Sequence, residues 1–339
     1  MMYGKSGMAR VALCLSFFFA VAACQFSPPS LKEQLAALSS NGFSGAVLVA
    51  EEGVILHEQS YGFASCNDTE LNSVDTVFSI GSITKNFTAT AIAQLDAAGL
   101  LRTENSIDFY LENVPEDKVD ITIQQLLDHR SGLHAYHETQ NLGDFEWQTR
   151  EEAVAEIFRK PLLFSSNSNY EYSNSGFTLL AAIIEEVSGL TYTQYIRERL
   201  LIPSGMTSTG FWGESISPMA STQNDVLGCS SPGNWQYSWV LVGNGGMVST
   251  IGDMRKWIYA LYESDLLDEP TKQKFGYNDL FRGGLGVAGG SSQHDFSADI
   301  EFSSKVEFLV IAVSNTDNLR AEFIAISLLK AAIKKNRNK

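Results

Sequence analysis

Residues 77–88 read VFSIGSITKNFT and open the segment of the chain that decides how it folds. Apolar residues recur at helical spacing after Ser82, and Gly99 stands where a helix C-cap belongs. The pattern predicts an amphipathic helix over 82–98. The apolar positions that carry it are Ile83, Phe87, Ala91, Ile92 and Leu95.

Ser82 and Lys85 form an S-x-x-K motif at the start of this helix, and a spacing of three places both side chains on one face. A serine hydroxyl is a poor nucleophile unless a neighbour removes its proton, and a lysine can do so if burial or nearby cations lower its pKa. The backbone N–H groups of a helix N-terminus also favour negative charge there. Taken alone, the motif is equally explained by an N-cap serine followed by a surface lysine.

Strand patterns occupy both ends of the chain. Ser30 and Glu33 form a capping box for a helix that ends near Gly42, and two β-type runs that form a hairpin follow. Near the C-terminus, three more short β-type runs precede a closing amphipathic helix. The predicted strands are 45–50, 54–57, 285–288, 297–302 and 306–314, and the closing helix is 319–334.

The middle of the chain is mostly helical. Thr122 and Gln125 form a capping pair for a helix over 122–128, and a later apolar stripe ends before Gly189. Strands at both ends with helices between them predict one α/β domain assembled from the two ends, with a helical domain inserted in it.

Further motifs resemble those of the class C β-lactamase and penicillin-binding-protein family. The resemblance spans roughly residues 40 to 330. It rests on 77–88, on LLDHRSGL at 126–133, on the Y-x-N triplet 172–174 with its continuation from Gly176 to Gly189, on LIPSGM at 201–206, and on GGMVST at 245–250 followed by Asp253.

This resemblance implies an α/β (α+β) fold, with an antiparallel sheet flanked by N- and C-terminal helices and an inserted helical domain. The β-lactamase-related domain would span 31–335, with its α/β part at about 31–100 and 245–335 and the helical insertion at about 101–244.

The resemblance also assigns the reaction. Ser82 would be the nucleophile of an acyl-enzyme, Lys85 its base, and Tyr172 the acid/base partner that protonates the leaving group. Asn174 would hydrogen-bond a substrate carbonyl. No cofactor is expected, and the substrate would be a small molecule or peptide.

The sequence departs from the family at its third motif. The expected basic-x-Gly triplet falls on 289–291, and no Lys or His stands there. Gly290, Ser291 and Ser292 are the predicted substrate-binding stretch, with the Ser292 N–H as the second oxyanion donor. In the family the missing cation helps to hold a substrate carboxylate, so an esterase or peptidase is favoured over an efficient β-lactamase. His294 lies out of register and is predicted to be a surface histidine.

The histidines at 129, 134 and 137 and the aromatic residues near Trp235 are not assigned to the predicted catalytic site. His134 and His137, with Glu138, have a spacing that zinc could use, but their glycine-containing segment reads as a loop, and no metal site is predicted. His129 is expected to pack and hydrogen-bond within its own turn. Trp235, with two neighbouring aromatic residues, is either a wall of the binding pocket or ordinary core.

The N-terminus reads as a signal peptide over residues 1–23, because basic residues precede an apolar run too short to span a bilayer. The run ends at Cys24 in a sequence that resembles a lipobox. We therefore expect an exported protein with a lipid on Cys24 and a tether over 24–30. Ordinary cleavage nearby is the alternative. Gln25 in place of Asp favours the outer membrane if the host is Gram-negative.

Charge and cysteine content narrow the functions further. The formal net charge of −15 disfavours binding to nucleic acid or to an anionic membrane surface, so contact with the membrane is expected only through the anchor. Cys66 and Cys229 remain after the signal peptide, and whether they pair is left open. The rival functions are a non-hydrolytic protein that binds cell-wall fragments and a structural lipoprotein.

Overall fold

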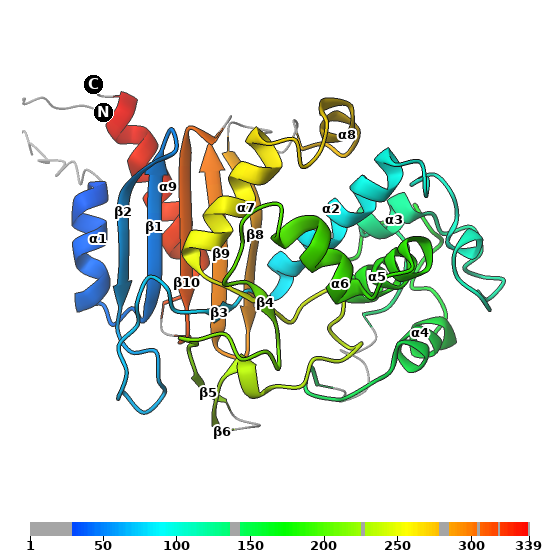
Figure 1. Ribbon diagram of the computed structural model, residues 1–339, viewed down its shortest axis with the longest axis horizontal. Helices are drawn as coiled ribbons and strands as arrows, with labels where there is room; N and C mark the ends of the chain where they lie inside the picture. Colours follow the sequence, from blue (N-terminus) through cyan, green and yellow to red (C-terminus); the bar gives the residue numbers. More distant parts are fainter. Residues whose placement is uncertain are drawn as a thin grey trace, which may run out of the picture.

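A computed structural model of the chain describes residues 29–135, 143–224, 228–277, 285–303, 306–317 and 319–337, with the backbone alone at 223–224, 285–293 and 336–337. Its centre is a five-stranded antiparallel sheet with the strand order β2-β1-β10-β9-β8 (Figure 1). The strands are β1 (Gly45–Glu51), β2 (Val54–Tyr61), β8 (Leu285–Gln293), β9 (Phe296–Ser303) and β10 (Phe308–Ser314). The two ends of the chain therefore meet in one sheet.

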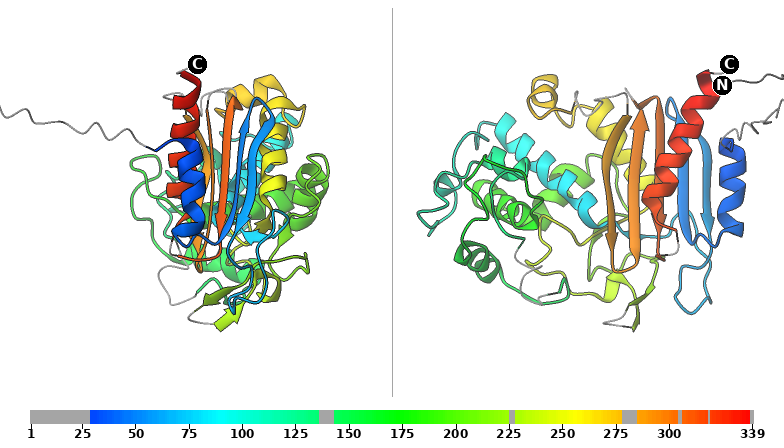
Figure 2. Two further views of the ribbon diagram at one scale, coloured as in Figure 1. Left: turned by 90° about the vertical axis from the view of Figure 1, so that its left-hand side faces the viewer. Right: turned by 180° about the vertical axis from the view of Figure 1, so that it is seen from behind.

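Helices cover both faces of this sheet (Figure 2). On one face lie α1 (Leu31–Ser40) and α9 (Ala321–Arg337), which pack against Val47 and Val310. On the other lies α7 (Ile251–Glu263), whose Trp257 belongs to the larger apolar core with Leu48 and Ile311. Because both faces are covered, β10 is buried along its whole length, and it reads as a continuous apolar run rather than an alternating one.

Beside the sheet lies a mostly helical region, in which α2 (Thr84–Ala97) packs against α5 (Asn174–Ser188) and α6 (Tyr192–Ile196). The other helical elements are η1 (Gly81–Ile83), η2 (Ile107–Phe109), α3 (Ile123–Leu127), α4 (Arg150–Arg159), η4 (Arg197–Leu201), η5 (Pro232–Asn234) and α8 (Glu269–Lys274). The short strands are β3 (Phe78–Ser79), β4 (Gly210–Phe211), β5 (Thr222–Asn224), β6 (Gly228–Ser230) and β7 (Met247–Ser249).

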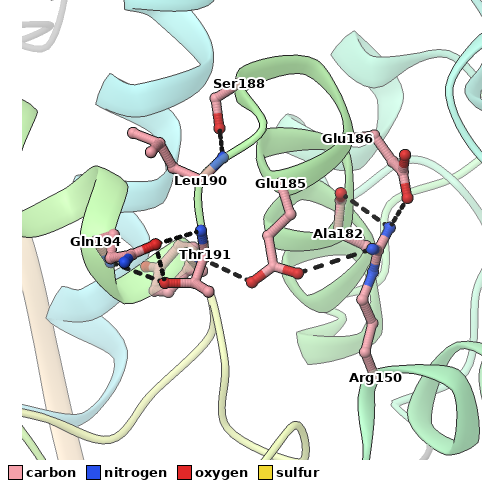
Figure 3. A network of polar contacts seen from close by, with 9 residues as sticks. Arg150, Ala182, Glu185, Glu186, Ser188, Leu190, Thr191 and Gln194 are labelled. Carbon is pink, nitrogen blue, oxygen red and sulfur yellow. Dashed lines mark hydrogen bonds and ion pairs between the residues drawn. The ribbon is translucent and has the colours of Figure 1, made fainter.

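A polar network fixes three of these helices to one another (Figure 3). Arg150 of α4 binds Glu186 of α5 at 2.5 Å and donates to the Ala182 carbonyl at 3.3 Å. Glu185 accepts the Tyr192 N–H of α6 at 2.7 Å. Burial raises the pKa of Glu185, and the Tyr192 amide and Arg150 oppose that rise. The network therefore joins α4, α5 and α6 to one another.

The predicted fold class is confirmed, and so are the capping boxes at Ser30 and Thr122. The predicted helix over 82–98 differs at its start, because Ser82 lies in the 3₁₀ turn η1 and the α-helix begins at Thr84. The Thr84 hydroxyl donates to the Gly81 carbonyl at 2.6 Å, which tightens this first turn.

The strand predicted over 285–288 continues to Gln293 as β8. Gly and Ser have low strand propensity, but the ladder to β9 overrides it. The third predicted C-terminal strand begins at Phe308 rather than at residue 306.

The question that the sequence left open about the cysteines is answered by a disulfide. Cys66 and Cys229 are bonded, with their Cα atoms 5.9 Å apart, and the bond ties the loop after β2 to β6. Residues 1–28, which include the predicted signal peptide and Cys24, lie outside the described residues. None of the helices described is both long and apolar enough to cross a membrane.

Candidate active site

Three of the predicted site residues meet where the sheet adjoins the helical region. Lys85, in the first turn of α2, places its Nζ 3.0 Å from Ser82 Oγ. Tyr172, just before α5, donates its hydroxyl to the same Oγ at 2.9 Å. The serine oxygen therefore lies between an amine and a phenol, each within hydrogen-bond distance.

Lys85 is only 7% exposed, and the position of its side chain is set by a contact that the sequence did not suggest. Its Nζ donates to the backbone carbonyl of Asn244 at 2.7 Å. The Asn244 side chain donates in turn to Thr178 Oγ1 and to the Val240 carbonyl, both at 2.9 Å. Gly243 and the two glycines that follow Asn244 indicate a turn in the sequence. They do not show that a carbonyl of this turn binds Lys85, because every residue has a backbone acceptor.

The turn that carries this carbonyl needs glycine at position 243. Gly243 has φ +83°, and a Cβ there would lie 2.4 Å from the Phe177 carbonyl oxygen and 2.7 Å from Ala181 Cβ. The Gly243 carbonyl also accepts the Thr88 hydroxyl of α2 at 2.7 Å. The turn is thus pressed against α5 and bonded to α2, and so it holds the Asn244 carbonyl at the amine.

His129 contacts the segment that carries Tyr172. Its backbone N–H bonds the Leu126 carbonyl within its own turn at 3.2 Å, as predicted, but its side chain bonds a distant segment. Its Nδ1 accepts the Ser173 N–H at 3.1 Å, and its ring centroid lies 4.5 Å from that of Tyr172. His129 and Ser173, in the segment before α5, are 44 residues apart, so only the folded chain brings them together. Burial and the nearby Lys85 charge lower the pKa of His129 to about 4, which keeps its ring neutral.

Two further predicted groups lie at the edges of the site. Asn174 is the first residue of α5, directly after the Tyr172 segment. Gly290, Ser291 and Ser292 lie on β8, which is the last strand of the sheet in the part of the chain described and packs against η1. An oxyanion donor supplied by the backbone N–H of this strand would not depend on the side chain that the residue carries.

His294 is not the surface histidine that the sequence predicted. It lies in the two-residue turn between β8 and β9, where His294 and Asp295 both have positive φ, and it is half-buried. Its Nε2 lies 3.1 Å from Asp144 Oδ2, and its ring is 4.3 Å from that of Phe145. Trp235, 5.7 Å away, is buried beside it and belongs to the core rather than to a pocket wall.

The arrangement is suited to nucleophilic attack on a carbonyl carbon, with an amine to take the serine proton and a phenol to deliver one. Within the described residues, no cluster of His, Cys, Asp or Glu could hold a metal ion. His134 lies in a loop, with its carbonyl bonded to the Ser175 hydroxyl, whereas His137 and Glu138 are outside the described residues.

Fold and site together define a class of protein, the serine hydrolases that activate a serine with a lysine three residues later in place of a histidine. The chain belongs to the β-lactamase family, because the family model described as Beta-lactamase matches residues 32–291.

The relatives that the chain resembles in sequence include two penicillin-binding proteins and an aminopeptidase. The chain is 30% identical to the putative penicillin-binding protein PbpX of Bacillus subtilis over 83% of this chain and 73% of the relative. It is 30% identical to penicillin-binding protein 4* of the same organism over 68% of this chain, but spans only 55% of that protein. It is also 26% identical to the D-aminopeptidase of Brucella anthropi, over 64% of this chain and 42% of the relative.

Solved structures share the fold. The D-amino acid amidase from Ochrobactrum anthropi, in complex with L-phenylalanine amide, superposes with a TM-score of 0.76 at 20% identity. The match covers 91% of this chain and 99% of that one.

Proposed function

We propose that this protein hydrolyses an ester or amide bond of a small molecule or peptide through an acyl-enzyme on Ser82. The observation that carries the proposal is the position of Ser82 Oγ, 3.0 Å from Lys85 Nζ and 2.9 Å from the Tyr172 hydroxyl. These are the distances over which a proton passes directly from one group to another.

In this mechanism neutral Lys85 accepts the proton of Ser82 as Oγ attacks the substrate carbonyl carbon. The charge that develops on the carbonyl oxygen is stabilised by the Ser82 N–H and by a β8 N–H, which we assign to Ser292. Tyr172 protonates the leaving alcohol or amine, and the proton on Lys85 restores the phenol. Water then attacks the acyl-enzyme with the same groups in reversed roles, which releases the acid and regenerates Ser82.

The substrate is proposed to be an ester or a small peptide rather than a β-lactam. Residues 285–293 contain no Lys, Arg or His, and His294, which follows them, is hydrogen-bonded to Asp144. A carboxylate beside the scissile bond would therefore find no cation on this strand. The relative named D-aminopeptidase suggests D-amino-acid amides as one class to test.

Turnover of three chromogenic substrates tests this preference: a short-chain nitrophenyl ester, a D-alanine nitroanilide and a cephalosporin. We expect kcat/KM for the ester or the anilide to exceed that for the cephalosporin at least tenfold, and Ser82→Ala to abolish both. Fast cephalosporin turnover would overturn the preference. Full activity of Ser82→Ala would overturn the mechanism. A non-hydrolytic binding function is not favoured, since the altered third motif is its sole support.

We also propose that the protein is exported and anchored by a lipid on Cys24. The sequence of residues 1–24 supports this, and so does the Cys66–Cys229 disulfide, because such bonds persist in oxidising compartments. Metabolic labelling with a radioactive fatty acid should mark the wild type and not Cys24→Ser. Equal labelling of the two would contradict the anchor.

A further inference from the structure

His129, which is outside the predicted catalytic set, is hydrogen-bonded to the residue before Tyr172 and to the residue after it. The backbone carbonyl of His129 accepts the Glu171 N–H at 3.0 Å, and Nδ1 of the His129 ring accepts the Ser173 N–H at 3.1 Å. Between these two bonds, the ring of His129 lies against the Tyr172 ring with centroids 4.5 Å apart and an interplanar angle of 31°. The residues before and after the tyrosine are therefore both bonded to the same histidine.

The backbone of His129 adopts a conformation that a histidine rarely takes. Its φ is +54°, in the left-handed region, where a residue with a Cβ is disfavoured. Such a conformation persists only where surrounding contacts hold it. The next residue of the turn is also held by hydrogen bonds. The Arg130 carbonyl accepts the Asn167 N–H at 2.8 Å, and the Arg130 guanidinium donates to Asn167 Oδ1 at 2.9 Å.

We propose that His129 is a positioning residue that fixes the Tyr172 phenol on Ser82 Oγ. Tyr172 is 41% exposed, so packing on one side alone does not define where its hydroxyl lies. The two hydrogen bonds to His129 fix the backbone on either side of Tyr172, and the ring contact fixes the side of the phenol that faces His129. Because Nδ1 accepts the Ser173 N–H, it carries no proton, and the ring proton is on Nε2.

The neutral ring is part of this role. A protonated His129 would lose the Nδ1 acceptor and place a positive charge beside the Lys85 amine, which must be neutral to act as the base. The titratable groups that face the ring are Lys85, Tyr170 and Tyr172, with Glu171 adjoining on the chain. The inference rests on the proposed function for its kinetic consequence, but its structural consequence is independent of it.

Asparagine provides a conservative replacement. Its Oδ1 can stand where Nδ1 accepts, and among residues with a Cβ it is one of the most tolerant of positive φ. We expect His129→Ala to lower kcat for the nitrophenyl ester about tenfold to a hundredfold with KM changed less than twofold, because displacement by about 1 Å has effects of this order. His129→Asn should recover most of the loss.

His57→Ala is the matched control. His57 is also half-buried and bonds a tyrosine, with its Nε2 3.0 Å from the Tyr61 hydroxyl, but it lies on β2, across the sheet from β8. It should lose stability without losing kcat. A His129→Ala enzyme with wild-type kcat, or a His129→Asn enzyme no better than His129→Ala, would overturn the inference.

Crystal structures of the two His129 variants separate this inference from the proposed function. The Tyr172 hydroxyl should move out of hydrogen-bond range of Ser82 Oγ in His129→Ala and return in His129→Asn. If the wild type acts on none of the substrates, the proposed function fails, and the displaced phenol still supports the positioning role. A phenol that stays on Ser82 in His129→Ala contradicts that role whatever the kinetics.

Discussion

Gly243→Ala should lower the rate of acylation by moving the carbonyl that holds Lys85. The added Cβ would lie 2.4 Å from the Phe177 carbonyl oxygen, about 1 Å closer than an ordinary carbon–oxygen contact of roughly 3.3–3.6 Å. The contact is with the backbone of the buried first turn of α5, which cannot yield easily. The turn itself must move, and the Asn244 carbonyl, one residue on, moves with it.

The size of the effect follows from that displacement. A left-handed alanine costs roughly 1–2 kcal/mol by itself, and the clash adds to the cost. If the Asn244 carbonyl leaves Lys85 Nζ by about 1 Å, the 2.7 Å bond is lost and the amine is no longer fixed on Ser82. Misplacement by about 1 Å lowers rates on the order of a hundredfold.

Gly99→Ala is the control for backbone strain alone. Gly99 has φ +69°, but a Cβ there would meet nothing within 4 Å. Both variants should unfold at lower urea concentration than the wild type, yet only Gly243→Ala should lose kcat on the nitrophenyl ester. A folded Gly243→Ala enzyme within twofold of the wild-type kcat would refute the reasoning that the Asn244 carbonyl positions Lys85.

Three further predictions concern stability and the β8–β9 hairpin. Cys66→Ser should lower the free energy of unfolding by about 2–5 kcal/mol, measured in urea, and an unchanged value would mean that the disulfide constrains little. Asp299 is 1% exposed, and burial with nearby carboxylates raises its pKa to about 8. The pKa of Asp299 is higher in the folded state than in the unfolded state, so its contribution to stability is complete below about pH 4 and is lost as the pH rises through 8. Between pH 6 and 8 the free energy of unfolding of the wild type should fall by on the order of 2 kcal/mol, and that of Asp299→Asn should not. Equal pH dependence of the two free energies would contradict this. His294→Ala removes the bond to Asp144 at the tip of the hairpin whose β8 strand packs against η1, so kcat/KM for the ester should fall about tenfold, whereas unchanged kinetics would show that the bond does not support the site.

Local signals account for what the sequence predicted well. The capping boxes at Ser30 and Thr122 and the left-handed Gly189 are interactions among neighbouring residues, so their patterns can be read directly. The strand pattern at both ends likewise predicted a sheet that joins the ends, because a short β-type run is a property of each segment by itself. The 3.0 Å approach of Lys85 to Ser82 follows from a spacing of three residues in one helical turn.

Contacts between distant segments account for what the sequence missed. The Asn244 carbonyl reaches Lys85 across 159 residues, and a main-chain acceptor is the same in every residue type. The bond from His129 to Ser173 joins two segments whose approach depends on the fold around them. The extent of β8 depends on its ladder to β9 rather than on its own composition, and His294 is half-buried because the turn between those strands carries it to Asp144.

Ser82 is the activated nucleophile of the proposed mechanism, and intact-mass spectrometry tests this most directly. The soluble protein, expressed from the residue after Cys24, is incubated separately with a fluorophosphonate, a penicillin and an activated ester, beside Ser82→Ala. We expect a mass increase that maps to Ser82 and is absent from the variant, with the fluorophosphonate or the ester labelling faster than the penicillin. No adduct with any reagent, or an equal adduct on Ser82→Ala, would contradict it.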